Sequence, residues 1–449
     1  MTLSNPDTPL PVSTAGDSDD DRALLERFQP IFDRIAAGAL QREKNRILPS
    51  EEVRWLREAG FGALRVPVAY GGSGATLPQL FRLLRLLGEA DSNLPHIFRA
   101  QFSFIEGLLN DDNEANRQRW FPRAAAGDIV GAAMAERAST TGNNVKLTPV
   151  DEHTWRLDGE KFYSTGTLYA NWISVAATDG TDRFSVIVSS TAPGVTRLDD
   201  WDGFGQRGSG SGTTRFENVI VEEQSLLRRF PIGEGRGDSY ITAFYQEVHL
   251  ATLAGITRAI LRDAIAFTQS RTRTFGIPGE SSPRHDPLVK RVIGRLSSLT
   301  YAAETLVDGV ARVLENVWQA VQANRVKPED YAYADIRAFQ AQQILLDQVL
   351  EASSLLFEVG GASATSETRL FDRHWRNART LASHNPASLR ASYLGDFYLN
   401  GVVPSAGWSK RFAEKKASEE TAQAEQTPSE ADVGHFSIAP VAETEAKAA

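Results

Sequence analysis

The chain has 449 residues, of which 41% are hydrophobic and 23% charged, and acidic residues exceed basic ones by nine. This composition is typical of a globular protein with about two or three domains. The acidic excess disfavours a nucleic-acid or anionic-membrane surface, because either would need clustered Lys and Arg. No apolar run approaches the length of a membrane span, and the first residues lack the features of a signal peptide. We therefore expect a cytoplasmic protein that binds small molecules and other proteins.

Sulfur is scarce in the sequence, which contains no Cys and only two methionines, Met1 and Met134. Disulfides, thiolate nucleophiles and Cys–metal sites are thereby excluded. Two explanations stay open. An oxidising active site would damage its own thiols and thioethers, or the protein is made when sulfur is limiting.

The two ends of the chain, residues 1–20 and 413–449, are polar or charged and poor in apolar residues, so we predict that both are disordered. Residues 21–126 carry apolar residues at three- and four-residue spacing, as in LPQLFRLLRLLGEA and IFRAQFSFIEGLL. This period predicts an N-terminal helical domain.

A different pattern fills residues 127–230, where short runs such as WISVAATD and FSVIVSS are bounded by Gly, Asp and Asn. These runs predict the strands of an antiparallel, barrel-like domain. Long helical segments return in residues 231–412, with Ala and Leu on one face, which predicts a four-helix bundle. The predicted fold class is therefore α+β, in the order helices, sheet, helices.

Motifs that carry chemistry are few. The sequence has no Gly-rich phosphate loop, no His–Glu zinc motif and no Gly-x-Ser-x-Gly elbow, and no metal site is predicted. Seven His are scattered along the chain, and a lone His is more often structural than catalytic. His384 differs because Pro386 ends the preceding helix and places His384 and Asn385 at a junction, where functional side chains often project.

The order of the segments, together with four local strings, resembles the acyl-CoA dehydrogenase superfamily over residues 25–410. The strings are LDGEKFYSTG, FGQRGSGSGTTRFENVIV, FTQSRTRTFG and FEVGGASAT. The resemblance implies that a flavin ring is contacted by Tyr163, Thr165 and Trp201. It further implies that the flavin phosphates are contacted by Arg271, Arg273, Gly360, Gly361 and Ser363. From the residues alone, the two arginines could instead form a solvated helix face, although a phosphate site is favoured because a guanidinium fork matches phosphate oxygens. Thr165 could equally be an ordinary strand residue, and the two aromatic rings could equally belong to the core.

The string RNARTLASHNPA falls where the dehydrogenases of this superfamily keep Tyr-Glu, so that Asn385 stands at the position of the catalytic glutamate. An amide cannot abstract a proton at neutral pH. Some members carry the base on an earlier helix, at the position matched by Tyr245, and Glu247 lies two residues further on. Two residues correspond to roughly 200° around a helix, so Glu247 is a poor replacement.

WRNARTLASHNP is more similar to the corresponding string of the superfamily's flavin-dependent monooxygenases, although Leu381 replaces the first of their two histidines. The resemblance implies a two-component enzyme that receives reduced FMN from a separate NAD(P)H-dependent flavin reductase. The reduced flavin then reacts with O2 to form a C4a-(hydro)peroxyflavin, which oxygenates the substrate. His384 and Thr165 are the expected catalytic residues, and substrate contacts are expected from Phe102, Trp201, His384 and Asn385.

A small organosulfur compound is the expected substrate, because the sulfur-poor composition suits an enzyme of sulfur acquisition during sulfur starvation. The next interpretation is that the chain is an amine or aromatic hydroxylase of the same fold. The alternatives are an acyl-CoA dehydrogenase with FAD that uses Glu247 or another base, and a flavoprotein without activity that serves as a scaffold. By analogy with the superfamily, we expect a homotetramer in which a neighbouring subunit completes the flavin site.

Overall fold

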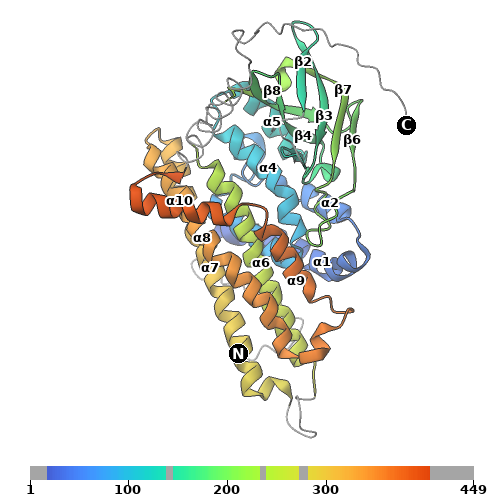
Figure 1. Cartoon of the computed structure of the whole chain (residues 1–449), viewed down its shortest axis with the longest axis vertical. Coiled ribbons are helices and arrows are strands. Elements are labelled where there is room, and N and C mark those ends of the chain that lie inside the picture. The colour runs from blue at the N-terminus through green and yellow to red at the C-terminus, as the bar shows by residue number, and fades with distance from the viewer. Residues whose placement is uncertain (1–17, 138–144, 233–238, 273–281, 405–449) are drawn as a thin grey trace, which may run out of the picture.

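The computed structural model describes residues 18–137, 145–232, 239–272 and 282–404 (Figure 1). The predicted C-terminal tail lies outside these residues. Residues 18–20 of the predicted N-terminal tail are described, and the first helix already begins at Asp19. Arg273 also lies outside the described residues.

The N-terminal part is helical, as predicted. Its helices are α1 (Asp19–Asn45), α2 (Ser50–Glu58), α3 (Leu77–Ala90), α4 (Asn93–Leu109) and α5 (Glu114–Ala125). Two of them begin with a capping box, in which a hydroxyl side chain and the residue three positions later satisfy each other's backbone N–H groups. Ser18 and Asp21 form the box of α1, and Thr76 and Gln79 form that of α3. Local sequence therefore fixes where these helices start.

The central part is an eight-stranded sheet in the order β6-β7-β3-β2-β4-β5-β8, with β1 paired to β4. Its strands are β1 (Val130–Ala133), β2 (Lys146–Pro149), β3 (Thr154–Lys161), β4 (Trp172–Thr178), β5 (Asp182–Ser189), β6 (Val195–Arg197), β7 (Thr214–Glu222) and β8 (Leu226–Pro231). The predicted closed barrel is wrong, because β6 and β8 are edges that do not pair with each other. The sheet is also mixed, since β1 and β2 both pair with β4 in parallel.

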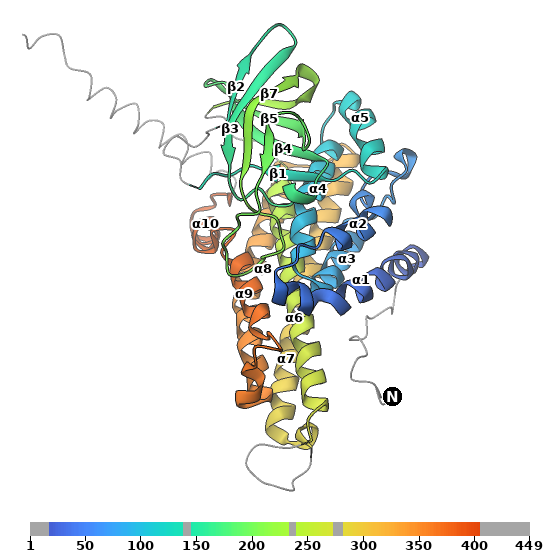
Figure 2. The ribbon, with the colours of Figure 1, turned by 90° about the vertical axis from the view of Figure 1, so that its right-hand side faces the viewer.

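The C-terminal part consists of α6 (Ile241–Gln269), α7 (Pro287–Gln322), α8 (Pro328–Leu355), α9 (Asp372–Ala382) and α10 (Ala387–Asn400). Figures 1 and 2 show the sheet at one end of the molecule and α6, α7, α8 and α9 running together toward the other end. Helix α6 is buried on nearly all sides because it lies between α3 and α4 on one side and the other bundle helices on the other. Gly88 and Gly255 allow α3 and α6 to cross closely, since a Cβ on Gly255 would lie 2.4 Å from the Arg85 carbonyl oxygen.

The largest hydrophobic core joins the N-terminal helices to the bundle, and separate cores fill the sheet and the space between the sheet and α4 and α5. The helices at the two ends of the chain thus form one folding unit that carries the sheet. In the described part of the chain, no helix is both long and apolar enough for a bilayer.

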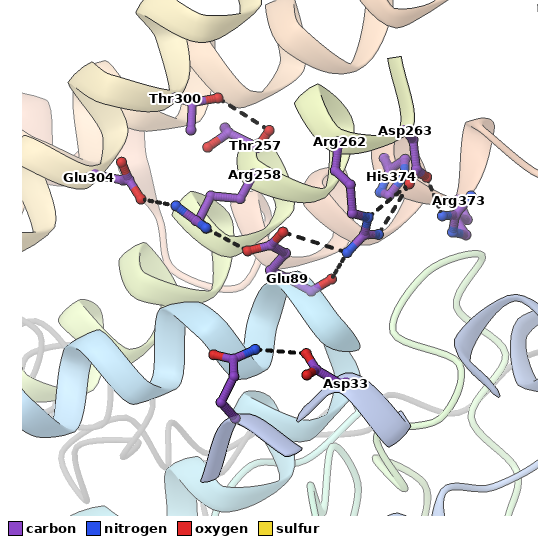
Figure 3. A network of polar contacts seen from close by, with 11 residues as sticks. Asp33, Glu89, Thr257, Arg258, Arg262, Asp263, Thr300, Glu304, Arg373 and His374 are labelled. Atoms are coloured by element: carbon purple, nitrogen blue, oxygen red, sulfur yellow. Dashed lines mark hydrogen bonds and ion pairs between the residues drawn. The ribbon is translucent and has the colours of Figure 1, made fainter. Parts of the chain in front are cut away.

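A network of ion pairs ties α3, α6, α7 and α9 together (Figure 3). The Arg258 guanidinium lies 2.5 Å from the Glu89 carboxylate and 2.7 Å from Glu304, while Asp263 pairs with Arg373 at 2.5 Å and with His374 at 2.8 Å. This network lines a groove of about 1050 Å³ between α1, α3, α6 and α9. It holds α9 against α6.

Candidate active site

Three histidines from three distant parts of the chain meet where the sheet joins the helices. His96 lies on α4, His249 on α6, and His384 at the turn that follows α9. The ring centroids are 5.2 Å apart for His96 and His249, 5.5 Å for His96 and His384, and 4.4 Å for His249 and His384. His96 and His249 are buried, whereas His384 is exposed. We call these three residues the histidine cluster.

The hydrogen bonds around His384 determine which of its nitrogens carries the proton. The Arg390 guanidinium can only donate, and it donates to Gln246 Oε1. Asn385 also donates to Gln246 Oε1, through Nδ2 at 2.7 Å, so its Oδ1 faces His384 Nδ1 at 3.1 Å. His384 Nδ1–H is therefore the donor in that contact, and the neutral ring presents a lone pair at Nε2.

His96 has the same tautomer for a similar reason. Its Nδ1 lies 3.2 Å from Gln206 Oε1, while the amide nitrogen of Gln206 donates to Ser92 at 3.1 Å. His96 Nε2 is buried and has no hydrogen-bond partner among the described residues, and neither ring nitrogen of His249 has one. Polar atoms of this kind are costly to bury without a partner, so these nitrogens are candidate contacts for a bound ligand.

Arg99 and Arg390 supply the positive charge that acts on the histidine cluster within the described chain. Desolvation, together with Arg99 and Arg390, lowers the pKa of His384 to about 4. Burial, together with His384 and Arg99, lowers the pKa values of His96 and His249 well below the ordinary value. All three rings are therefore neutral at pH 7. Arg99 is itself held by the Tyr245 carbonyl oxygen at 3.2 Å.

A chain of hydroxyl groups leads from Gln206 to Thr165. Ser209 Oγ donates to the Gln206 carbonyl oxygen at 2.7 Å and lies 2.7 Å from Ser211 Oγ, which lies 2.9 Å from Thr165 Oγ1. Because the Ser209 proton is committed to a carbonyl oxygen, Ser211 must donate to Ser209, and Thr165 must donate to Ser211. The backbone supports this arrangement, since Gly166 N–H donates to Ser209 O at 3.1 Å.

Aromatic side chains form an exposed rim beside Thr165. Tyr163 is 46% exposed and has φ of 58°, a left-handed conformation that non-glycine residues seldom adopt. Its ring centroid lies 6.0 Å from that of Trp201, whose indole N–H donates to the Gly205 carbonyl oxygen at 3.1 Å. The predicted ring contacts Tyr163, Thr165 and Trp201 thus lie on one surface. Exposed aromatic surface next to hydroxyl groups fits the faces and polar edge of a flavin ring.

The predicted phosphate contacts also lie together, beyond the C-terminal end of α6. Arg271 donates to the Val359 carbonyl oxygen at 3.2 Å, and Ser363 donates to that of Gly360 at 2.9 Å. Gly361 has φ of 53°, which glycine adopts without strain. However, Arg271 follows the end of α6, and the rise of a helix puts it about 30 Å from His249, further than one FMN molecule reaches.

Two expected residues lie outside the cluster. Phe102 is fully buried in the core, with its ring centroid 5.6 Å from that of Phe61, rather than beside His384. Glu247 is also fully buried, and the charges acting on it are those of Asp308 and Arg85. Burial and Asp308 raise its pKa well above the ordinary value. Within the described chain, neither of its carboxylate oxygens has a hydrogen-bond partner, so it forms no hydrogen bond with the histidine cluster.

Sequence reasoning missed His96, His249, Arg99 and Gln206. His249 stands in the apolar stretch HLATLAGI and His96 in LPHIF. A polar ring at helical spacing among apolar residues was the available signal, but its partners depend on how α4 and α6 cross, which local sequence does not reveal.

Comparisons with known proteins agree with this architecture. The N-terminal domain model of acyl-CoA dehydrogenase matches residues 18–128, and the C-terminal domain model matches residues 248–388. Together these two ranges cover more than half of the chain.

The chain is 27% identical to the dibenzothiophene monooxygenase of Rhodococcus erythropolis over 408 residues, which cover 86% of this chain and 94% of that protein. It is 27% identical to the probable FMNH2-dependent monooxygenase SfnC of Pseudomonas putida, with 86% and 96% covered. Among solved structures, TdsC of Paenibacillus sp. A11-2 in complex with FMN and indole has a TM-score of 0.79 and 27% identity, with 86% of this chain and 98% of that chain covered.

The matched domains, the helix–sheet–helix order and these relatives lead to one conclusion: the chain belongs to the acyl-CoA dehydrogenase superfamily, and its relatives include a dibenzothiophene monooxygenase and a probable FMNH2-dependent monooxygenase.

Proposed function

We propose that this chain is an FMNH2-dependent monooxygenase that transfers one oxygen atom of O2 to a small organosulfur substrate. A separate NAD(P)H-dependent reductase would deliver the reduced flavin. When bound, reduced FMN supplies the electrons for oxygen activation, through a C4a-(hydro)peroxyflavin in the chemistry that the resemblance implies.

The observation that carries this proposal is the character of the groups around His384. A dehydrogenase needs a carboxylate to remove a proton from carbon, whereas Asn385 is an amide and Glu247 lies elsewhere. The neutral histidines, with lowered pKa values, are weak bases. The position thus suits hydrogen bonding to an oxygen species better than proton abstraction.

The tautomer of His384 determines whether its second ring nitrogen can donate or accept a hydrogen bond. Its Nδ1–H is committed to Asn385, so the neutral ring offers Nε2 as an acceptor. Nε2 of His384 would therefore accept a hydrogen bond from the reacting oxygen species, while Asn385 and Gln246 hold the ring in place. Trp201 and Tyr163 would cover the ring of the flavin and exclude water from it.

The charge around the histidine cluster supports the proposed substrate class. Arg99 and Arg390 stabilise partial negative charge on oxygen, as in a sulfoxide, sulfone or sulfinate, and they repel a cationic amine. The name dibenzothiophene monooxygenase supports an organosulfur substrate from an independent direction. The sulfur-poor composition is compatible with synthesis during sulfur starvation.

We further propose that the active form is a homo-oligomer, with a tetramer expected. Arg271 lies about 30 Å from His249 by the rise of α6, so the expected phosphate contacts and the histidine cluster are too far apart to serve one FMN within a chain. A second copy would supply the phosphate contacts to the ring site of the first.

The test supplies the purified protein with FMN, NADH and a flavin reductase under ¹⁸O2, with dibenzothiophene, an alkyl sulfone and an alkanesulfinate as candidate substrates. We expect ¹⁸O in the product, and we expect His384→Ala to abolish its incorporation while FMN binding persists. His153→Ala is the matched control, because His153 is exposed on the turn between β2 and β3.

Undiminished ¹⁸O incorporation by His384→Ala would contradict the assignment of His384. Bleaching of tightly bound FAD by an acyl-CoA thioester, without oxygen uptake, would instead establish the dehydrogenase alternative.

A further inference from the structure

We propose that His96, His249 and His384 bind a divalent transition-metal ion of the zinc class. One ligand nitrogen from each of the three rings lies within 4.8 Å of the others. Three neutral imidazoles with an open fourth position are a recurrent ligand set for Zn²⁺, Co²⁺, Ni²⁺ and Cu²⁺.

The nitrogens must approach only slightly to coordinate a metal. With metal–nitrogen bonds of about 2.0–2.1 Å in tetrahedral geometry, ligand nitrogens lie about 3.3 Å apart. Closure from the present separations is a shift of about 1.5 Å or less. His96 and His249 are held on buried helices, but His384 lies in the turn between the end of α9 and Pro386. His384 is therefore the ligand that can move.

The hydrogen bonds behind the rings match those of metal ligands. A histidine that binds a metal through one nitrogen usually donates its other N–H to a fixed acceptor. Gln206 Oε1 accepts from His96 Nδ1, and Asn385 Oδ1 accepts from His384 Nδ1. Both bonds leave Nε2 with its lone pair available, and His249 has two nitrogens without partners among the described residues.

The charges near the cluster define which ions bind. Arg99 is cationic and acts on all three rings, and Arg390 acts on His249 and His384. Among the described residues, the group of candidate ligands contains three histidines and no carboxylate. Hard ions such as Mg²⁺ and Ca²⁺ need oxygen ligands and would not bind. A transition-metal ion would be accepted together with an anionic fourth ligand, such as hydroxide, that offsets the charge of the arginines.

A bound metal would occupy the His384 Nε2 that the proposed function uses. Metal loading would then suppress oxygenation, and this consequence rests on the proposed function. The binding itself does not, because it can be measured on the full chain without flavin or substrate.

The experiment adds Co²⁺ to the flavin-free full-length protein and records its visible d–d absorption, followed by calorimetric titration with Zn²⁺. We expect one Co²⁺ per chain with the intense bands of four- or five-coordinate cobalt, and competition by Zn²⁺ but not by Mg²⁺. His249→Gln and His384→Gln should each weaken Zn²⁺ binding about 100-fold or more, and Asn385→Ala about 10-fold. His153→Gln is the matched control and should bind as the parent does.

Absence of the cobalt bands would overturn the proposal, as would Zn²⁺ binding that His249→Gln and His384→Gln leave unchanged. Loss of binding in His153→Gln would assign the metal to an exposed histidine and also overturn it. His384→Gln changes a partly exposed turn, so its result stands even if His249→Gln does not fold. If His384→Gln lost Zn²⁺ binding but kept full ¹⁸O incorporation, the result would uphold the metal site and contradict the role of His384 in the proposed function.

Discussion

Ser211→Ala tests the direction of the hydroxyl chain that ends at Thr165. In the parent protein Thr165 donates to Ser211 at 2.9 Å, which leaves its Oγ1 as an acceptor. The resemblance to the flavin-dependent monooxygenases implies that Thr165 lies near flavin N5. Reduced flavin carries a hydrogen at N5 and oxidised flavin does not, so an acceptor there favours the reduced form. Without the Ser211 hydroxyl, Thr165 is free to donate, because its remaining acceptor, the Tyr163 carbonyl oxygen, is 3.5 Å away.

The size of the effect follows from one hydrogen bond. A net contribution of about 0.5–1.5 kcal/mol changes the ratio of the dissociation constants for oxidised and reduced FMN by about 2- to 12-fold. For a two-electron couple this corresponds to about 10–30 mV. We expect the midpoint potential of bound FMN to fall by this amount in Ser211→Ala.

The potential is measured by anaerobic spectroelectrochemical titration, and oxidised FMN affinity is measured separately from flavin fluorescence. Thr165→Val provides the matched background, since Ser211→Ala should shift the potential there by much less. A potential that is unchanged or raised in Ser211→Ala, with FMN still bound, would refute the inferred direction. An equal shift in both backgrounds would show that Thr165 does not contact N5.

Three further predictions concern the framework. Glu247→Gln should raise the free energy of unfolding at pH 8 by on the order of 1 kcal/mol or more. Burial raises the pKa of Glu247, so the folded protein is destabilised when this carboxyl loses its proton at high pH, and Gln has no proton to lose. Product formation should be unchanged. Burial and the neighbouring Arg373 guanidinium lower the pKa of His374 from 6.5 to about 4. The stabilising contribution of the neutral ring is therefore complete above pH 6.5 and is lost as the pH falls toward 4. In urea unfolding, the free energy of unfolding should fall between pH 7 and pH 5 by about 1–2 kcal/mol less in His374→Gln than in the parent. Gly360→Ala should destabilise the fold by about 1–3 kcal/mol in thermal unfolding, since its Cβ would lie 2.0 Å from the Phe267 ring, whereas Gly309→Ala, which meets nothing within 4 Å, should be neutral or stabilising.

The order of helices and strands could be predicted from the sequence because the spacing of apolar residues and the helix-capping residues determine it locally. Closure of the sheet could not, since it depends on whether the edges β6 and β8 meet, and the strand pattern is the same in either case. The position of Glu247 away from the site was predictable because helix geometry fixes it relative to its neighbours.

The candidate site was only partly predictable. His384 could be identified from its local string and the proline behind it, and Arg271 and Gly360 do lie together as their strings imply. His96 and His249 could not be identified, because tertiary packing of α4 and α6 brings them to His384. The proton positions were also hidden from the sequence, since they depend on the bond from Arg390 to Gln246.

The length of α6 has a genetic consequence. Arg271 follows the end of α6, about 30 Å from His249 along the axis of the helix. In the proposed oligomer, where one subunit supplies the groups around His384 and another the phosphate contacts, a defect at His384 and a defect at Arg271 would damage different halves of a shared site. Two inactive proteins, His384→Ala and Arg271→Ala, should complement each other when their subunits are co-expressed or mixed after dissociation. Mixed oligomers would contain some sites with both halves intact, so that partial activity returns from two parents that have none.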